Sequence, residues 1–146
     1  MTTQTDPLLQ VLDAYAAAVL TKDVAAFAAL YDADVHLFDM WGSWSMQGIA
    51  AWRDMASGWF ASLGDERVVV SSQQAQSTQL GDLAIGHAIL TFTAIAADGS
   101  KLRSLDNRLT VALRRNDDGW KIIHEHTSAP IEHASMKAVL QYPAGG

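Results

Sequence analysis

Apolar side chains recur every three to four residues in the first 63 positions of the chain and at every second position from residue 67 onward. The first spacing predicts amphipathic helices, and the second predicts half-buried strands. One helix is expected to begin at Asp6-Pro7, because an aspartate can cap the first turn and proline already has a helical φ. Asp23 is expected to cap a second, shorter helix, and a third helix ends at Gly64. A short strand over residues 35–38 lies between the second and third helices.

Four consecutive strands are expected in the second half of the chain. Turn signals at residues 81–82, 98–99 and 116–119 separate stretches in which apolar and polar side chains alternate. The tail, residues 131–146, is expected to form a short helix with a loose end. Helices that precede a run of antiparallel strands predict one α+β domain over residues 1–146, with the helices gathered on one side of a curved sheet.

The composition narrows the classes of function. Apolar residues make up 49% of the 146 residues and charged residues 18%, which is typical of a packed globular protein. The formal charge of −6, without clusters of Lys or Arg, argues against nucleic-acid binding. The chain has no cysteine and therefore no disulfide, thiol nucleophile or thiolate metal site. Because residues 1–7 lack the pattern of a secretory signal and no stretch could span a bilayer, we expect a cytoplasmic protein without membrane contact.

Several stretches carry a family resemblance. They are Lys-Asp-Val at residues 22–24, Tyr-Asp-Ala-Asp-Val at residues 31–35, Gly48 before the third helix, and GWKIIHEHTSAP at residues 119–130. With the order of predicted elements, they resemble the nuclear transport factor 2-like superfamily, which includes SnoaL-like polyketide cyclases and ketosteroid isomerase. The last stretch is also similar to the calcium/calmodulin-dependent kinase II association domain. The resemblance implies a cone-shaped, mostly antiparallel sheet with three N-terminal helices on its concave side, around one pocket.

Asp39 and Tyr15 are the candidate catalytic residues. Asp39 ends the first strand and precedes an aromatic loop, so its carboxylate is expected at the mouth of an apolar cavity that raises its pKa. The resemblance to ketosteroid isomerase implies a catalytic aspartate nine positions before Gly48, which is Asp39, and a tyrosine oxyanion donor on the first helix, which is Tyr15. That enzyme also uses a second, protonated aspartate, for which residues 109–111 offer no acid. The structural alternative makes Tyr15 a core residue and Asp39 a strand-end cap.

The strand register decides which polar side chains share a face of the sheet. Turns at residues 98–99 and 116–119 pair Ile89 with Arg108 and Arg115 with Trp120. One face then carries His87, Thr91, Asp106, Arg108, Thr110, Glu125 and Thr127. The other carries Leu90, Phe92, Leu109, Val111, Leu113, Trp120, Ile122, His124 and His126.

Either face could line the pocket. A helix-covered face is normally the apolar one, with the polar face solvated. The resemblance to the kinase association domain, in which a pocket arginine matches Arg108, favours the polar face. On that interpretation His87, Arg108 and Glu125 bind the ligand, and Asp106 or Glu125 pairs with Arg108, because a buried charge needs a partner.

Two other groups of side chains carry types of residue that could form a site. His124 and His126 point the same way on one strand but have no third ligand at a suitable spacing, so no metal and no cofactor are expected. Trp52 and Trp59 lie on the apolar stripe of the third helix. Most of that stripe is core, but these two rings are candidates to hold a flat substrate.

Two hypotheses of function follow. The first is an isomerase, cyclase or dehydratase that moves a proton on a hydrophobic substrate, with Asp39 as base and Tyr15 as donor to an oxyanion. The second is a non-catalytic module that binds a carboxylate-bearing ligand at Arg108 or drives oligomerisation. A homodimer is expected in either case, since the apolar face would otherwise expose Leu109, Val111, Leu113 and Ile122.

Overall fold

The computed structural model describes residues 6–143 of the chain. Three helices precede most of the sheet: α1 (Pro7–Thr21), α2 (Val24–Ala28) and α3 (Ile49–Ser62). The strands are β1 (Tyr31–Phe38), β2 (Met46–Gln47), β3 (Arg67–Leu80), β4 (Leu83–Ile95), β5 (Lys101–Asn116) and β6 (Gly119–Ser128). The first strand is longer than the 35–38 expected from the sequence, and the loop after it contains the short strand β2. The other helices and strands up to residue 128 occur in the predicted order.

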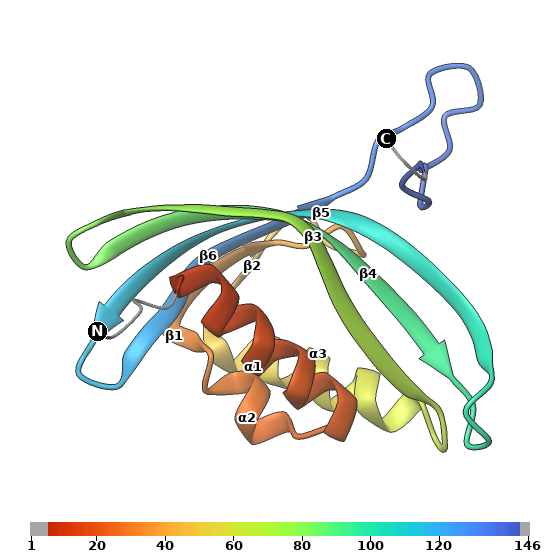
Figure 1. The fold of residues 1–146 in the computed structure, drawn as a ribbon, viewed down its shortest axis with the longest axis horizontal. Coiled ribbons are helices and arrows are strands. Elements are labelled where there is room, and N and C mark those ends of the chain that lie inside the picture. The colour runs from red at the N-terminus through yellow and green to blue at the C-terminus, as the bar shows by residue number, and fades with distance from the viewer. Residues whose placement is uncertain (1–5, 144–146) are drawn as a thin grey trace.

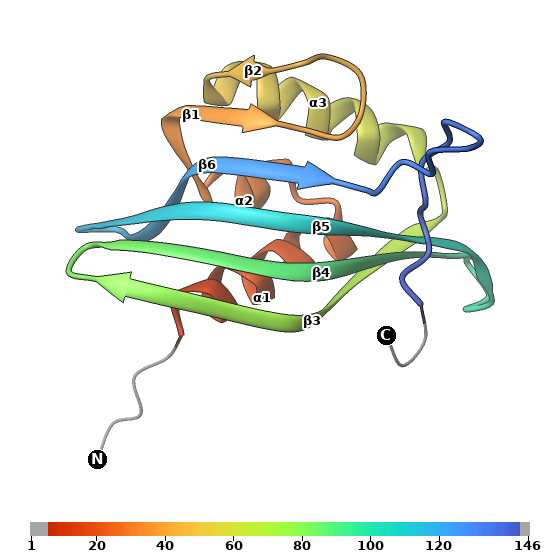
Figure 2. The same cartoon turned by 90° about the horizontal axis from the view of Figure 1, so that it is seen from above.

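The six strands form one curved sheet in the order β2-β1-β6-β5-β4-β3. Strand β1 is parallel to β6, and all other neighbours are antiparallel. The three helices lie together beneath the concave face of this sheet, and the opposite face carries no helix (Figure 1). Seen from above, the long strands β3 to β6 run side by side across the helices (Figure 2). The α+β fold with a cone-shaped, mostly antiparallel sheet is therefore confirmed.

The two predicted aspartate caps are present. The Asp6 carboxylate accepts hydrogen bonds from the backbone N–H groups of Leu8 (2.8 Å) and Leu9 (3.3 Å) at the start of α1. The Asp23 carboxylate accepts one from the N–H of Ala26 (3.0 Å) at the start of α2. These bonds satisfy N–H groups that have no partner within the helix, so each helix begins where its cap stands.

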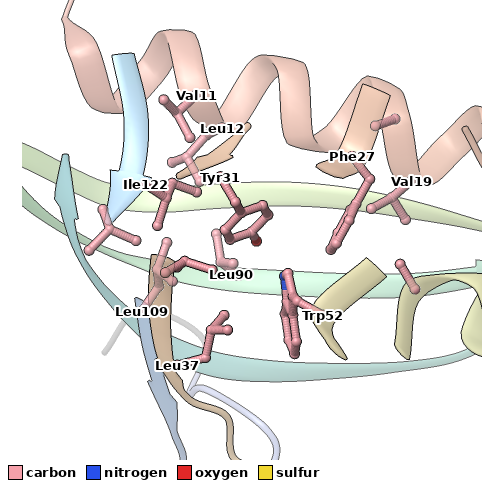
Figure 3. Packing of buried hydrophobic residues seen from close by; sticks show 14 of the residues in the cluster. Val11, Leu12, Val19, Phe27, Tyr31, Leu37, Trp52, Leu90, Leu109 and Ile122 are labelled. Carbon is pink, nitrogen blue, oxygen red and sulfur yellow. The ribbon is translucent and has the colours of Figure 1, made fainter. Parts of the chain in front are cut away.

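The apolar face of the sheet packs against the helices and forms the core (Figure 3). Phe27 of α2 is fully buried and contacts the rings of Tyr31, Trp52 and Phe60. The four residues expected to form an exposed dimer patch are buried in this core: Leu109, Val111, Leu113 and Ile122. The reason given for a homodimer is therefore wrong, because the helices already cover that face.

Strand β6 contains one more residue than the β5 segment opposite it. The pairs Ile89–Arg108 and Arg115–Trp120 occur as predicted. Between them, however, Leu113 pairs with Ile122 while Ala112 pairs with His124, so Ile123 is extra and forms a β-bulge. Beyond the bulge the alternation of β6 is inverted. Glu125 and Thr127 consequently point to the same side as Val111 and Leu109, and His124 and His126 point to the other, which reverses the predicted assignment of these four β6 side chains.

The described part of the tail, residues 131–143, contains no helix, which corrects the sequence expectation. It makes an isolated bridge between Ile131 and Ala138 and then runs along β5. The N–H of Asp106 donates to the Leu140 carbonyl (2.7 Å), and the Asp106 carboxylate accepts from the N–H of Tyr142 (2.6 Å). The predicted loose end falls on residues 144–146, which lie outside the described residues.

Within the described residues, no helix is long and apolar enough to cross a lipid bilayer.

Candidate active site

A cavity of about 690 Å³ lies between the concave sheet face and the helices. Its walls are mostly apolar and come from α1, the loop after β1, α3 and strands β4 to β6. Aromatic and aliphatic lining residues include Leu12, Trp41, Trp52, Met55, Trp59, Leu90, Phe92, Leu105, Leu109, Val111 and Ile122. The polar lining residues include Tyr15, Asp39, Asn107, Glu125 and Thr127. A large apolar pocket with a few converging polar groups is typical of a small-molecule site.

Asp39 lies at the end of β1, where the chain turns into the aromatic loop. Its Oδ1 accepts a hydrogen bond from the Thr127 hydroxyl (3.1 Å), and Oδ2 accepts one from the N–H of Trp41 (3.4 Å). The Thr127 oxygen in turn accepts from the N–H of Met40 (2.9 Å). Partial burial raises the pKa of Asp39, and these hydrogen bonds oppose the rise without cancelling it. The carboxylate is thus held in place and is more basic than an exposed aspartate.

Glu125 is the most deeply buried acid of the cavity, at 7% exposure. The Tyr31 hydroxyl donates a hydrogen bond to its Oε1 (2.8 Å). Burial, helped by the negative charge of Asp39, raises the pKa of Glu125 to about 7, although the Tyr31 hydrogen bond favours the charged form. Two carboxyl groups with raised pKa values therefore share one apolar cavity, which is a common arrangement for acid–base chemistry.

Tyr15 lies on α1 and is half-buried at the cavity wall. Its ring packs against Phe27 (5.5 Å between ring centroids) and Phe92 (6.4 Å). Burial and the charges of Glu125 and Asp39 hold the pKa of the Tyr15 phenol well above its ordinary value. The phenol therefore keeps its proton, and no hydrogen bond of its hydroxyl occurs within residues 6–143. This hydroxyl is available as a donor to a molecule in the cavity.

Trp52 and Trp59 both line the cavity from α3. Trp52 packs against Tyr31 at 6.0 Å between ring centroids (Figure 3). Its indole Nε1 is buried and has no hydrogen-bond partner in the described structure. Burial and the charge of Glu125 raise the pKa of Tyr31 well above its ordinary value. Tyr31 thus stays protonated and orients Glu125.

Sequence reasoning missed Tyr31 and Asn107 as site residues. No local pattern links Tyr31 to Glu125, because 94 positions of the chain separate the two residues. Asn107 lines the cavity between Leu105 and Leu109 on β5 and is 7% exposed. A signal was present, because an asparagine at an inward position of an apolar alternation is unusual.

His87 and Arg108 lie outside the cavity. Both are exposed on the outer sheet face, where Arg108 Nε donates to the Ser128 hydroxyl (3.0 Å). The expectation that the polar face lines the pocket is wrong, because that face is the solvated one. The expected partners of Arg108 are engaged elsewhere: Glu125 lies inside the cavity, and the Asp106 carboxylate accepts hydrogen bonds from Thr91 (2.6 Å) and the tail.

The His124–His126 pair also faces outward. His124 Nδ1 lies 2.7 Å from the backbone oxygen of His36, and both rings pack against Phe38. Across residues 6–143, no group of three or more His, Cys, Asp or Glu side chains has the arrangement of a metal site. The contacts these histidines make are those of a packed surface cluster.

The fold and the cavity together define a nuclear transport factor 2-like protein. The chain is similar to a nuclear transport factor 2-like protein of unknown function from Pseudomonas putida KT2440, with 25% identity, 93% of each chain covered and a TM-score of 0.79. It also resembles a proposed calcium/calmodulin-dependent protein kinase II association domain from Xanthomonas campestris (20% identity, 90% and 91% covered, TM-score 0.74). A third neighbour is a proposed dehydratase of the same class from Streptomyces avermitilis (17% identity, 92% and 95% covered, TM-score 0.68).

The chain belongs to the SnoaL-like domain family, whose pattern matches residues 8–132. No curated protein sequence matches it.

Proposed function

We propose that this protein is an enzyme that binds a flat, largely apolar organic molecule in the cavity and moves a proton on it. Asp39 is the base, and Tyr15 is the hydrogen-bond donor to the oxyanion that develops. The observation that carries the proposal is that both residues, which are far apart in the sequence, line one apolar cavity together with Glu125.

The state of each group suits this chemistry. A general base works best when its pKa approaches the working pH, and burial shifts the pKa of Asp39 in that direction. The Tyr15 phenol stays protonated, so it can stabilise negative charge on a substrate oxygen. A hydrogen bond directed at a developing charge is stronger inside a water-poor cavity than in solution.

The proposed step begins at a carbon next to a substrate carbonyl. Asp39 takes the proton, the C–H electrons form an enolate, and the enolate oxygen accepts a hydrogen bond from Tyr15. If the enolate is conjugated, return of the proton from Asp39 to another carbon gives an isomerase. Loss of a β-hydroxyl group as water, with the proton from Asp39, gives a dehydratase. Attack of the enolate on a second carbonyl, whose oxygen takes the proton from Asp39, gives a cyclase. The resemblance of the fold to a proposed dehydratase is consistent with this range.

The charges favour a neutral substrate. Because Arg108 lies on the outer face, it cannot bind a carboxylate in the cavity, and the two acids of the cavity would repel a carboxylate-bearing ligand. Arg103 lies at the cavity wall, but its guanidinium is already paired with Glu66 (2.6 Å). Glu125, with a pKa of about 7, is partly protonated at neutral pH and can donate a hydrogen bond or return a proton.

The test uses 2-tetralone, a flat bicyclic ketone with acidic C–H groups beside its carbonyl. In D₂O the protein is expected to accelerate exchange of those hydrogens, followed by NMR. Asp39→Asn keeps the size of the side chain and removes the base, and should lower the exchange rate by about two to four orders of magnitude. Tyr15→Phe should cost less, since it removes charge stabilisation and leaves the base in place.

Asp34→Asn is the matched control, because Asp34 is an exposed aspartate on the same strand as Asp39. It should exchange 2-tetralone at the wild-type rate. Wild-type exchange in Asp39→Asn would exclude Asp39 as the base. If every protein binds 2-tetralone and none accelerates exchange, the catalytic proposal is wrong and the cavity only binds flat apolar molecules.

The homodimer and the cytoplasmic location stay predictions. A different reason to expect a dimer is the outer sheet face, on which Phe38, Leu83 and Ile85 are exposed. Light scattering at micromolar concentration tests it, with Ile85→Lys as the variant that should shift the mass toward a monomer.

A further inference from the structure

Asn107 holds a buried acceptor that the fold leaves unused. Its side chain points inward from β5 and lines the cavity. The amide oxygen Oδ1 is buried and has no hydrogen-bond partner in the described structure. Its neighbours on this face of the sheet are Leu105 and Leu109 on the same strand and Leu90 directly opposite on β4. None of these side chains can donate a hydrogen bond.

An unpaired carbonyl oxygen in such a place destabilises the folded protein. Most buried polar groups in folded proteins are hydrogen-bonded, so each exception calls for an explanation. A leucine at position 107 would fit the pattern of its apolar neighbours and would leave no buried oxygen without a hydrogen bond. The position therefore has the properties of a binding group that is satisfied only when a ligand is present.

The hydrogen bond of the amide nitrogen determines the orientation of the Asn107 side chain. Asn107 Nδ2 donates to the sulfur of Met40 at 3.4 Å, which leaves Oδ1 as the free atom. The N–H of Met40 is bound to Thr127, which also donates to Asp39. Asn107 is thus linked through Met40 and Thr127 to the carboxylate proposed as the base, and a ligand at Asp39 lies close to Asn107.

We propose that Asn107 Oδ1 accepts a hydrogen bond from a hydroxyl or N–H group of the ligand. Combined with the proposed function, which supplies a carbonyl for Tyr15, the substrate is a flat, neutral molecule that carries both a ketone oxygen and a separate hydrogen-bond donor. An aromatic or polycyclic hydroxy ketone has this pattern. The Asn107 contact itself concerns binding and stands without any turnover.

The experiment compares two probes of the same flat shape by isothermal titration calorimetry. 2-Naphthol carries a hydroxyl donor, whereas 2-methoxynaphthalene has an oxygen that can only accept. Wild type is expected to bind 2-naphthol about tenfold more tightly, since the methoxy compound leaves Oδ1 unpaired. In Asn107→Leu this preference should fall to about twofold or less, with 2-methoxynaphthalene bound as well as before or better.

Asp39→Asn is measured in parallel, because its carboxylate could also accept from the hydroxyl. If the preference disappears in Asp39→Asn and persists in Asn107→Leu, Asp39 is the acceptor and the proposal is wrong. Equal loss of both probes in Asn107→Leu would also overturn it. Thermal melting supplies a second measure: Asn107→Leu should melt at or above the wild-type temperature without ligand. If the protein does not accelerate 2-tetralone exchange but still prefers 2-naphthol over 2-methoxynaphthalene, the catalytic proposal is wrong and the Asn107 contact stands.

Discussion

Replacing Glu125 by glutamine is expected to change how the stability of the protein depends on pH. In the folded state burial raises the pKa of the Glu125 carboxyl to about 7, compared with an ordinary value of 4.5. Below pH 4.5 the group is neutral in both the folded and unfolded states and contributes no pH dependence. As the pH rises from about 5 to 7, the unfolded chain loses this proton more readily, and the folded state is progressively disfavoured.

The size of the pH effect on stability follows from the pKa shift of Glu125. A rise from 4.5 to about 7 corresponds to about 3 kcal/mol of folding free energy lost by wild type above pH 7. Glu125→Gln carries no titrating proton at this position and escapes that loss. Its amide oxygen can still accept from Tyr31, and any cost of placing the amide nitrogen is independent of pH. The difference in stability between the two proteins should therefore shift in favour of the variant by about 3 kcal/mol between pH 4.5 and pH 8.5.

The assay is urea unfolding of both proteins at half-unit steps from pH 4.5 to 8.5, with the free energy extrapolated to water. Glu132→Gln, at an exposed position of the tail, is the control for the loss of one negative charge. Its difference from wild type should stay nearly flat across the same range. If the Glu125→Gln difference is equally flat, Glu125 does not titrate near neutrality, and its assignment as a buried proton-holding group is wrong.

Two further predictions concern the frame of the site. Gly86→Ala should destabilise the protein by about 1–3 kcal/mol, since a Cβ at this position would lie 3.0 Å from the Leu8 side chain of α1. Gly58→Ala is the matched variant: its Cβ would contact no other atom, and it should stabilise α3 by up to about 1 kcal/mol. Urea unfolding measures the free energy of both variants. Removing residues 131–146 should keep the fold but weaken 2-naphthol binding severalfold, because Leu140 forms part of the cavity wall; calorimetry with unchanged affinity would contradict this.

Much of the fold could be predicted because it depends on short-range signals. The caps at Asp6 and Asp23 and the strand turns lie within a few residues of the structure they determine. The two hairpin registers were correct for the same reason, since a tight turn sets the pairing of the strands beside it. The prediction of a helix in the tail was wrong. Its described residues are held by a backbone hydrogen bond from Asp106 to Leu140 and by the Asp106 carboxylate, and no local sequence pattern indicates these contacts.

The candidate site was only partly predictable. Asp39 and Tyr15 were expected at the pocket mainly from the resemblance to ketosteroid isomerase, and both line the cavity. Their catalytic roles stay predictions. His87 and Arg108 were misplaced because the resemblance to the kinase association domain favoured the polar face, which is the solvated one. The bulge at Ile123, which no glycine or proline marks, reversed only the side chains of β6. The convergence of Glu125 with Tyr31 and Asp39 depends on the parallel pairing of β1 with β6, a contact between the two ends of the sheet-forming sequence.

The bulge at Ile123 has a consequence for how β6 tolerates a change in its length. Ile122 lies opposite Leu113 and His124 opposite Ala112, so deleting Ile123 would remove only the extra residue and leave Glu125 and Thr127 facing the cavity. A strand that instead paired Ile123 with Ala112 would turn His124 and His126 inward and Glu125 outward. The bulge thus keeps a carboxylic acid, rather than two imidazoles, in the cavity.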